Sequence, residues 1–172
     1  ARRRCGAASS AEYSPMMPEL TITEYDRPNM RAEAAAIRMM ADAFDPQFGE
    51  AWSGQQLSAF TSLSGVRLSL AQVDATYLGF TLARHVADEA ELLLLAVAKS
   101  WQKKGVGAQL VNHVMVSARL SGVKSLHLEV RSNNPAIYFY DKMGFENVHR
   151  RPAYYKGYDG KTYDALSYRV DV

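Results

Sequence analysis

The chain contains 172 residues with a mass of 19.1 kDa, the size of one average domain. With 48% hydrophobic and 22% charged residues, it has the composition of a soluble globular protein, which excludes a disordered chain. The single cysteine, Cys5, excludes an internal disulfide and a four-cysteine zinc site, and we expect no metal. The longest apolar run, residues 92–98, is far shorter than the ~20 residues that a membrane helix needs. Because no leader of signal-peptide type is seen, we expect a cytoplasmic protein.

The net charge of +2 hides an uneven distribution. Residues 18–98 carry 5 basic and 11 acidic side chains, whereas residues 99–172 carry 12 basic and 6 acidic ones. Such a field attracts partners of both signs, unless the two halves interleave in space and the asymmetry averages out.

The first half of the chain predicts a tail, strands and two helices. Residues 1–17 show no period and are predicted to be a flexible tail, which leaves 18–172 as a single domain. Leu20 and Ile22 indicate a short strand, residues 31–44 have helical spacing, and Ser53 is suited to cap a second helix that continues through Leu63. The alternating segments 66–73 and 77–84 predict an antiparallel pair. The apolar run at 91–98 predicts a strand buried on both faces.

The second half begins with an amphipathic helix over residues 105–120, which Gly122 ends. Residues 124–131 alternate as a strand with Glu129 on its polar face. Asn134 and Pro135 read as the N-cap and first residue of a last helix, which Gly144 closes, and segments 145–150 and 162–170 predict two final strands. The order predicts an α/β (α+β) fold, in which a largely antiparallel sheet contains one strand–helix–strand unit.

A glycine-containing turn precedes the amphipathic helix. Two glycines at a helix start let a ligand approach the backbone and leave unpaired N–H groups, and the helix dipole and two lysines add positive potential. This combination suits a pyrophosphate, although glycines at such a place also serve simple tight turns. The turn comprises Gln102, Lys103, Lys104, Gly105, Val106, Gly107 and Ala108.

The turn and a second motif together resemble the GNAT superfamily of acetyl-CoA-dependent N-acetyltransferases. The first motif is Gln-x-x-Gly-x-Gly/Ala after a strand, and the second is Asn-x-x-Ala-x-x-x-Tyr-x-x-x-Gly-Phe, present at 133–145. Within the superfamily the sequence is most similar to the bacterial ribosomal-protein alanine N-acetyltransferases (RimI type). The segments that carry this likeness include 88–90, 95–97, 128–131 and 150–155.

The resemblance implies a GNAT fold, with a mixed, mostly antiparallel sheet of about six to seven strands and about four helices. It also implies acetyl-CoA as the cosubstrate and acetyl transfer to an amine. Glu129 matches the general base and Tyr140 the general acid of the family. The residues that it assigns to the cofactor are the turn at 102–108, Leu95, Ala96, Val97 and Asn133.

Three departures from the family pattern affect these assignments. The segment between Glu129 and Asn133 is one residue shorter, so Asn134 is an alternative to Asn133. Position 108 is alanine where the family often has a basic residue, and Ala98-Lys99 replaces the usual Asp-Pro.

The acceptor amine must be neutral before it can react. An α-amine has a pKa of ~8 and a lysine amine ~10.4, so at pH 7 deprotonation of an N-terminus costs about 3 kcal/mol less. One carboxylate is therefore an adequate base for an N-terminal amine. His127, on the same face as Glu129, is the alternative base, and Glu129 is alternatively a surface or ion-paired residue. Likewise, Tyr140 is alternatively a core residue, Asn133 a cap, and 95–97 ordinary sheet.

Aromatic residues are candidates for the acceptor groove. Tyr154 and Tyr155, expected between the last two strands, correspond to the acceptor-positioning region, and Trp52 and Phe48 are candidates for the opposite wall, with core packing as the alternative. The implied partner is a protein N-terminus, such as that of a ribosomal protein starting with alanine, with no membrane or direct nucleic-acid contact and a monomer or weak homodimer. The alternatives are a GNAT enzyme for a small amine and a non-catalytic ribosome- or RNA-binding module.

Overall fold

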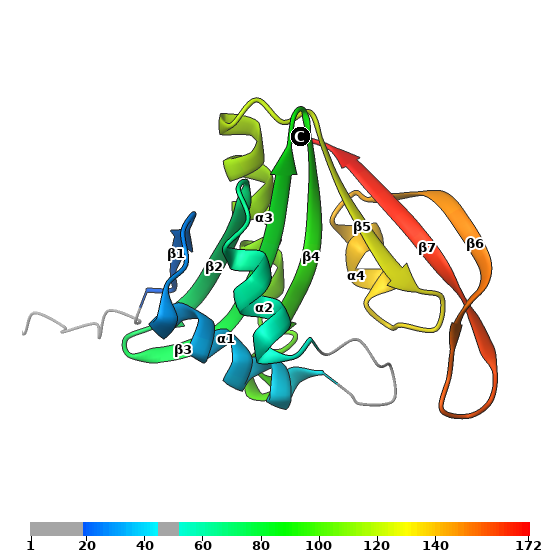
Figure 1. Ribbon diagram of the computed structural model, residues 1–172, viewed down its shortest axis with the longest axis horizontal. Helices are drawn as coiled ribbons and strands as arrows, with labels where there is room; N and C mark the ends of the chain where they lie inside the picture. The colour runs from blue at the N-terminus through cyan, green and yellow to red at the C-terminus, as the bar shows by residue number, and fades with distance from the viewer. Residues whose placement is uncertain (1–18, 45–51) are drawn as a thin grey trace, which may run out of the picture.

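The computed structural model describes residues 19–44 and 52–172, which form a seven-stranded sheet flanked by helices (Figure 1). The predicted tail and Phe48 lie outside these ranges. The helices are α1 (Met30–Ala43), α2 (Gly54–Thr61), a 3-10 helix (Lys99–Trp101), α3 (Val106–Leu120) and α4 (Ile137–Lys142). The strands are β1 (Thr21–Tyr25), β2 (Val66–Val73), β3 (Thr76–Val86), β4 (Glu89–Val97), β5 (Ser125–Arg131), β6 (Glu146–Lys156) and β7 (Thr162–Asp171).

The sheet has the strand order β1-β2-β3-β4-β5-β7-β6. Every neighbouring pair is antiparallel except β4 and β5, which are parallel and joined by α3. The predicted mixed sheet with one strand–helix–strand unit is therefore confirmed.

Helices cover both faces of the sheet (Figure 1). On one face α1 and α2 pack against β2–β4 in a core that includes Ala36, Leu57 and Phe80. On the other face α3 and α4 pack in a second core that includes Val111 and Leu126.

The helix ends follow local sequence signals. Ser53 caps α2 as predicted: its Oγ accepts from Gln56 N at 3.2 Å, and Gln56 Oε1 accepts from Ser53 N at 2.8 Å. Gly122 and Gly144 follow α3 and α4 with φ of 81° and 86°, which glycine adopts without strain. The last helix, however, starts later than predicted, since Ala136 is its N-cap. Asn134 instead closes the preceding turn by accepting from Ala136 N at 2.9 Å.

A β-bulge explains the apolar run of β4. Leu94 pairs with Leu82 and Leu92 with Ala83, so Leu93 is an extra residue in the ladder. The bulge switches the buried face: Leu92 packs in the α3–α4 core, whereas Leu94 packs in the α1–α2 core. The prediction of burial on both faces thus holds for Leu92, Leu94 and Ala96. The other apolar residues of the run, 93, 95, 97 and 98, are half-buried, and Glu91 is exposed.

The predicted end of β6 at residue 150 is wrong. The strand continues to Lys156, so Tyr154 and Tyr155 belong to it rather than to a loop. The register shifts between Arg151 and Tyr155, and this irregularity interrupts the alternation that would reveal a strand in the sequence.

A cluster of charges fastens α3 to the sheet. Glu24 of β1 accepts from Arg67 Nη1 of β2 at 2.7 Å, and from His113 Nε2 and Ser117 Oγ of α3 at 3.1 and 3.0 Å. Burial alone would raise the pKa of Glu24, but these hydrogen bonds outweigh it and lower the pKa to about 2. The cluster therefore stabilises the folded state wherever Glu24 is ionised.

Glu24→Gln is expected to destabilise the protein in a pH-dependent way. The stability due to the lowered pKa is fully present above the unfolded value of 4.5 and is lost as the pH falls towards about 2. Near pH 6 the free energy of unfolding of the wild type should be higher than that of the variant by roughly 1–2 kcal/mol. This difference is smaller than the pKa shift alone would give, because Glu24 is partly exposed to solvent. Urea unfolding at pH 6, 4 and 3 measures this gap, which must shrink with acidification; a gap that stays constant would contradict the assignment.

Candidate active site

The central feature of the site is a parting of two strands. The ladder between β4 and β5 comprises only Glu89–Glu91 with Ser125–His127; no further pair joins these two described strands. Beyond it the strands diverge (Figure 1), and a cavity of about 500 Å³ opens beside the gap. Side chains from β4, β5, α4 and β6 and from the α1–α2 region line it. They are Phe44, Trp52, Gln56, Glu91, Leu92, Leu93, Leu94, Leu95, Leu128, Glu129, Val130, Asn134, Ala136, Tyr140 and Tyr155.

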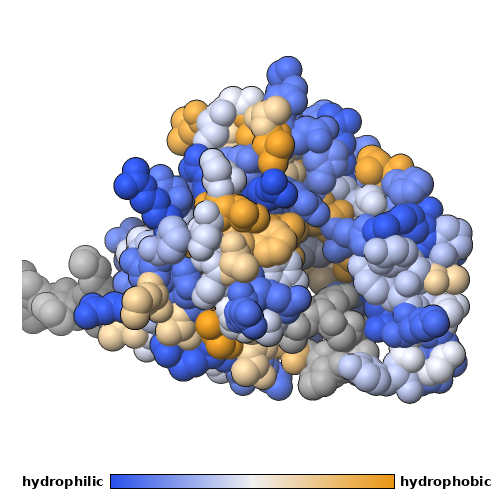
Figure 2. Space-filling view, viewed as in Figure 1, coloured by the Kyte–Doolittle hydropathy of each residue, from blue (hydrophilic) through white to orange (hydrophobic). Residues whose placement is uncertain are grey.

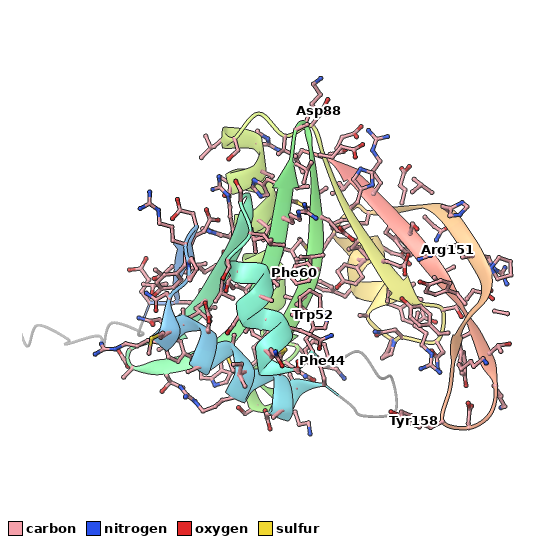
Figure 3. The ribbon with its side chains drawn as sticks, in the orientation of Figure 1. Phe44, Trp52, Phe60, Asp88, Arg151 and Tyr158 are labelled. Atoms are coloured by element: carbon pink, nitrogen blue, oxygen red, sulfur yellow. The ribbon has the colours of Figure 1, made fainter. Side chains whose placement is uncertain are left out.

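The cavity brings together residues that the sequence predicted in separate roles. Glu129, Tyr140, Leu95, Trp52 and Tyr155 all line it. Figure 3 shows Trp52 and Phe44 on one side of the opening and Arg151 on the other. Apolar side chains gather over the centre of the view in Figure 2, where α2 lies, whereas the surface over β6 and β7 is mostly hydrophilic. Within the cavity, Phe44 and Trp52 of the α1–α2 region form an apolar wall, and Glu129 and Tyr155 of β5 and β6 form a polar wall.

Glu129 projects on the same face of the sheet as α1 and α2. Its neighbours Leu128 and Val130 are buried in the α3–α4 core, so strand alternation directs Glu129 the other way. Tyr155 Oη donates to Glu129 Oε1 at 2.8 Å, and Arg151 Nη2 donates to Oε2. This bond is the main reason why the pKa of Arg151 is raised above its ordinary value. Glu129 is therefore both a cavity residue and an ion-paired one.

The alternative base, His127, lies elsewhere. Its Nε2 is 2.9 Å from Ser125 Oγ and 3.8 Å from Glu89 Oε1. It lines a separate, smaller hollow with Arg84 and Glu91 and not the cavity. The geometry favours Glu129 over His127 as the base.

Tyr140 reaches the cavity from α4. It is only 9% exposed, and its ring packs edge-to-face against Phe139 and Phe145, with centroid distances of 5.3 and 5.7 Å. The two alternatives for this residue, core packing and lining the site, are therefore both found in the structure.

The predicted phosphate turn lies at the end of β4. Gln102 Nε2 donates to Val97 O at 3.1 Å, which ties the turn to the strand. Gly105 precedes α3 with φ of 84°, and no side chain caps the helix start, so its first-turn amides face outward. Lys104 Nζ lies 5.0 Å from the Trp101 ring. A Cβ on Gly107 would meet Phe139 and Val97 side chains at 3.6 and 3.7 Å, which places this turn beside α4 and the gap.

The remaining predicted cofactor residues lie around this turn. Val106 is buried in the core, so only its backbone is available, and Ala108 is half-buried. Asn133 is exposed and does not line the cavity, whereas Asn134 does. The shorter loop left a choice between Asn133 and Asn134, and in the structure it is Asn134 that lies at the cavity.

The free edge of β4 offers backbone donors. Ala98 N donates to Leu78 O on β3 at 2.8 Å, and alternate residues of a strand direct their amides to opposite sides. Leu95 and Val97 therefore direct theirs towards the gap and β5, whereas the amide of Ala96, like that of Ala98, is directed towards β3. The Leu95 and Val97 amides are suited to stabilise an oxyanion.

The lining residues that escaped prediction include Phe44, Gln56 and Glu91, and Arg151, which pairs with Glu129, was also missed. The pair Arg150-Arg151 marks a basic segment in the sequence, but only the register of β6 shows which arginine turns towards Glu129. Tyr154 is exposed and lies outside the cavity, although its ring contacts that of Tyr155 with a centroid distance of 5.0 Å.

Among the described residues, two other kinds of site are absent. No group of three His, Cys, Asp or Glu side chains there is arranged to hold a metal ion. None of the helices in the same ranges has the length and hydrophobicity needed to cross a membrane.

Comparison with known proteins gives concordant results. Residues 37–145 match the acetyltransferase (GNAT) family. A 78-residue segment is 37% identical to the ribosomal protein bS18-alanine N-acetyltransferase of Haemophilus influenzae, covering 45% of this chain and 53% of that protein. The chain thus spans about half the length of the curated relatives it matches.

Solved structures show the same architecture. The ribosomal-protein-S18-alanine N-acetyltransferase from Escherichia coli aligns with a TM-score of 0.77 and 27% identity, over 90% of this chain and 94% of that one. A putative streptothricin acetyltransferase from Bacillus anthracis, in complex with acetyl coenzyme A, shares the fold with a TM-score of 0.59 and 22% identity over 64% of each chain. Since the family match covers more than half of its residues, the chain belongs to the acetyltransferase (GNAT) family.

Proposed function

We propose that the protein transfers the acetyl group of acetyl-CoA to the N-terminal α-amine of a protein, namely a ribosomal protein that begins with alanine. The observation that carries the proposal is that Glu129 and Tyr140 line one cavity at the parting of β4 and β5. The names of the Haemophilus and Escherichia relatives support the choice of acceptor.

The N-terminus of α3 is suited to bind the pyrophosphate of acetyl-CoA. Its first-turn amides lack a side-chain cap, and the Cβ position of Gly105 meets nothing within 4 Å. Lys103 and Lys104 supply positive charge, and the helix dipole adds to it. Asn134, at the cavity, is suited to hydrogen-bond the pantetheine arm.

Glu129 acts as the general base. At pH 7 most acceptor N-termini are protonated, and the carboxylate removes one proton, directly or through a water molecule. The neutral nitrogen then attacks the acetyl carbonyl carbon. As the tetrahedral intermediate forms, its oxygen becomes negatively charged, and the amides of Leu95 and Val97 stabilise it.

Tyr140 completes the reaction as the general acid. When the carbon–sulfur bond breaks, the thiolate of coenzyme A accepts the phenolic proton of Tyr140. The product nitrogen gives up its remaining extra proton to the phenolate through water, Glu129 returns its proton to the solvent, and the acetylated amine is released. Because Tyr140 lies on α4 and Glu129 projects towards the face of α1 and α2, acid and base approach the gap from different elements.

The acceptor lies between the apolar and polar walls of the opening. Trp52 and Phe44 provide apolar contact for a small first side chain. Tyr155 combines an aromatic ring with a hydroxyl that is already directed to Glu129. Such a site holds an extended chain end.

The test is mass spectrometry of products after incubation with acetyl-CoA and peptides that differ in their first residue. We expect acetylation of Ala-starting basic peptides, at the α-amine only, and none of the same peptides with a blocked N-terminus. Faster turnover of a panel of polyamines and amino acids would favour the small-amine alternative. Salt-sensitive RNA binding without any acetyl transfer would favour the binding module.

A further inference from the structure

Two side chains of β6 reach Glu129 although β7 lies between β5 and β6. The β7 residue paired with Glu129 is Ser167, and the next residue on that face, Ala165, pairs with Arg151. Both are small, so Arg151 can extend across β7 to the carboxylate. Tyr155, whose partner on β7 is Tyr163, reaches the carboxylate from the following pair on that face. The small side chains of β7 thus leave room for the contact between β6 and Glu129.

A bulge in β6, directly after Arg151, sets the position of Tyr155. Arg151 pairs with Ala165 and Tyr155 with Tyr163, so residues 152–154 stand opposite Asp164 alone. Asp164 holds the bulge by accepting from Ala153 N at 2.8 Å and from Arg150 Nε at 2.5 Å. Ala153 has φ of 51°, a conformation that a non-glycine residue adopts only when its surroundings impose it. Because the bulge follows Arg151, its effect is to return Tyr155 to the face that carries Arg151 and Glu129, and the strain at Ala153 accompanies this placement.

The ion pair between Arg151 and Glu129 is exposed enough to be exchanged. Their side chains are 40% and 28% accessible, and ion pairs in contact with solvent are among the weakest contributors to stability. The guanidinium has a second support, since its carbon lies 3.8 Å from the centroid of the Tyr154 ring. The guanidinium can therefore separate from the carboxylate of Glu129 while it stays in contact with the Tyr154 ring.

We propose that Arg151 is a displaceable counter-ion of Glu129, which occupies the carboxylate until the ammonium group of the acceptor takes its place. The inference rests on the proposed function, because the cation that competes with Arg151 for Glu129 is the protonated α-amine of the acceptor. Both are N–H donors with one positive charge, and Glu129 Oε2 is the atom that they share. Once displaced, the guanidinium remains over Tyr154, and the proton of the ammonium passes to Glu129. Arg151 is thus a positioning residue that tunes acceptor affinity.

The test uses Arg151→Met, which keeps the length of the side chain and removes its charge. With the competitor gone, the KM for an Ala-starting peptide is expected to fall by about threefold to fivefold, while kcat changes by less than about twofold. Arg151→Lys retains a competing cation and should keep the wild-type KM. The Kd of the peptide for the enzyme bound to coenzyme A, measured by calorimetry without turnover, should fall in parallel in Arg151→Met.

Arg169→Met is the matched control. Arg169 lies on β7, pairs with Asp171 at 2.8 Å, and is as accessible as Arg151, so its loss removes one positive charge elsewhere. A peptide KM and Kd that fall equally in this variant would overturn the proposal in favour of a general charge effect. A higher KM, or a kcat lowered more than about tenfold, in Arg151→Met would overturn it in favour of a purely structural role. If the wild type neither binds nor acetylates any peptide, the proposed function itself fails, which is a distinct result.

Discussion

Replacing Glu129 with glutamine is expected to lower kcat by about 10²–10⁴-fold, the range that one general base contributes. Glutamine keeps the size of the side chain and an oxygen that can accept from Tyr155, but it cannot take a proton at neutral pH. The Kd for coenzyme A should be unchanged, because the predicted phosphate turn belongs to α3 and Glu129 to β5. Steady-state kinetics with an Ala-starting peptide and calorimetry with coenzyme A measure the two effects.

Glu91→Gln is the control for this substitution. Glu91 also lines the cavity, on β4, and its substitution removes the same charge from the cavity lining. We expect it to retain activity within about threefold, because nothing assigns it a proton transfer. If Glu129→Gln kept activity comparable to that of Glu91→Gln, Glu129 would not be the base.

Gly107→Asp is expected to weaken binding of coenzyme A by more than about 100-fold. A carboxylate at this position would lie beside the phosphates, and two like charges 4 Å apart repel by about 4 kcal/mol at an effective dielectric constant of 20. The fold should tolerate the change, since a Cβ there meets only side chains at 3.6 Å or more. An acid in the first turn also stabilises the helix by about 0.3–1 kcal/mol. Calorimetry gives the affinity and thermal unfolding the stability.

Gly107→Asn separates charge from size. Asparagine matches aspartate in volume and carries no charge, so it should bind coenzyme A markedly better than the aspartate variant. Equal affinities for the two variants would show that space, rather than phosphate repulsion, governs this position. Unchanged affinity in Gly107→Asp would place the pyrophosphate elsewhere and contradict the role of the turn.

Much of the architecture could be predicted because its signals are local. The alternation at 124–131 identified β5 and the outward position of Glu129, and Gly122 and Gly144 marked two helix ends. The resemblance to the family then supplied the mixed, mostly antiparallel sheet and assigned Glu129 and Tyr140 to one reaction, which periodicity alone does not reveal.

The rest depends on contacts between distant residues. The bulge in β6 exists because Asp164, more than ten residues away, accepts from Ala153 and Arg150, so the sequence period fails there and the strand end was placed too early. Because the predicted strand ends at residue 150, the sequence also does not reveal that Arg151 faces Glu129. Likewise, whether Asn133 or Asn134 faces the cavity follows from the turn that Asn134 closes, which no pattern in the chain specifies.

The irregular course of β6 has a consequence for how the molecule meets other copies of itself. β6 is the outermost strand on its side of the described sheet, and nearly all of its residues are accessible. A long open strand of this kind invites edge-to-edge aggregation, because its free N–H and C=O groups can template another chain. Pro152 lacks a donor, the register shifts break the ladder twice, and the strand carries Arg150, Arg151 and Lys156. The bulge that presents a side chain to the base therefore also protects the edge from polymerisation.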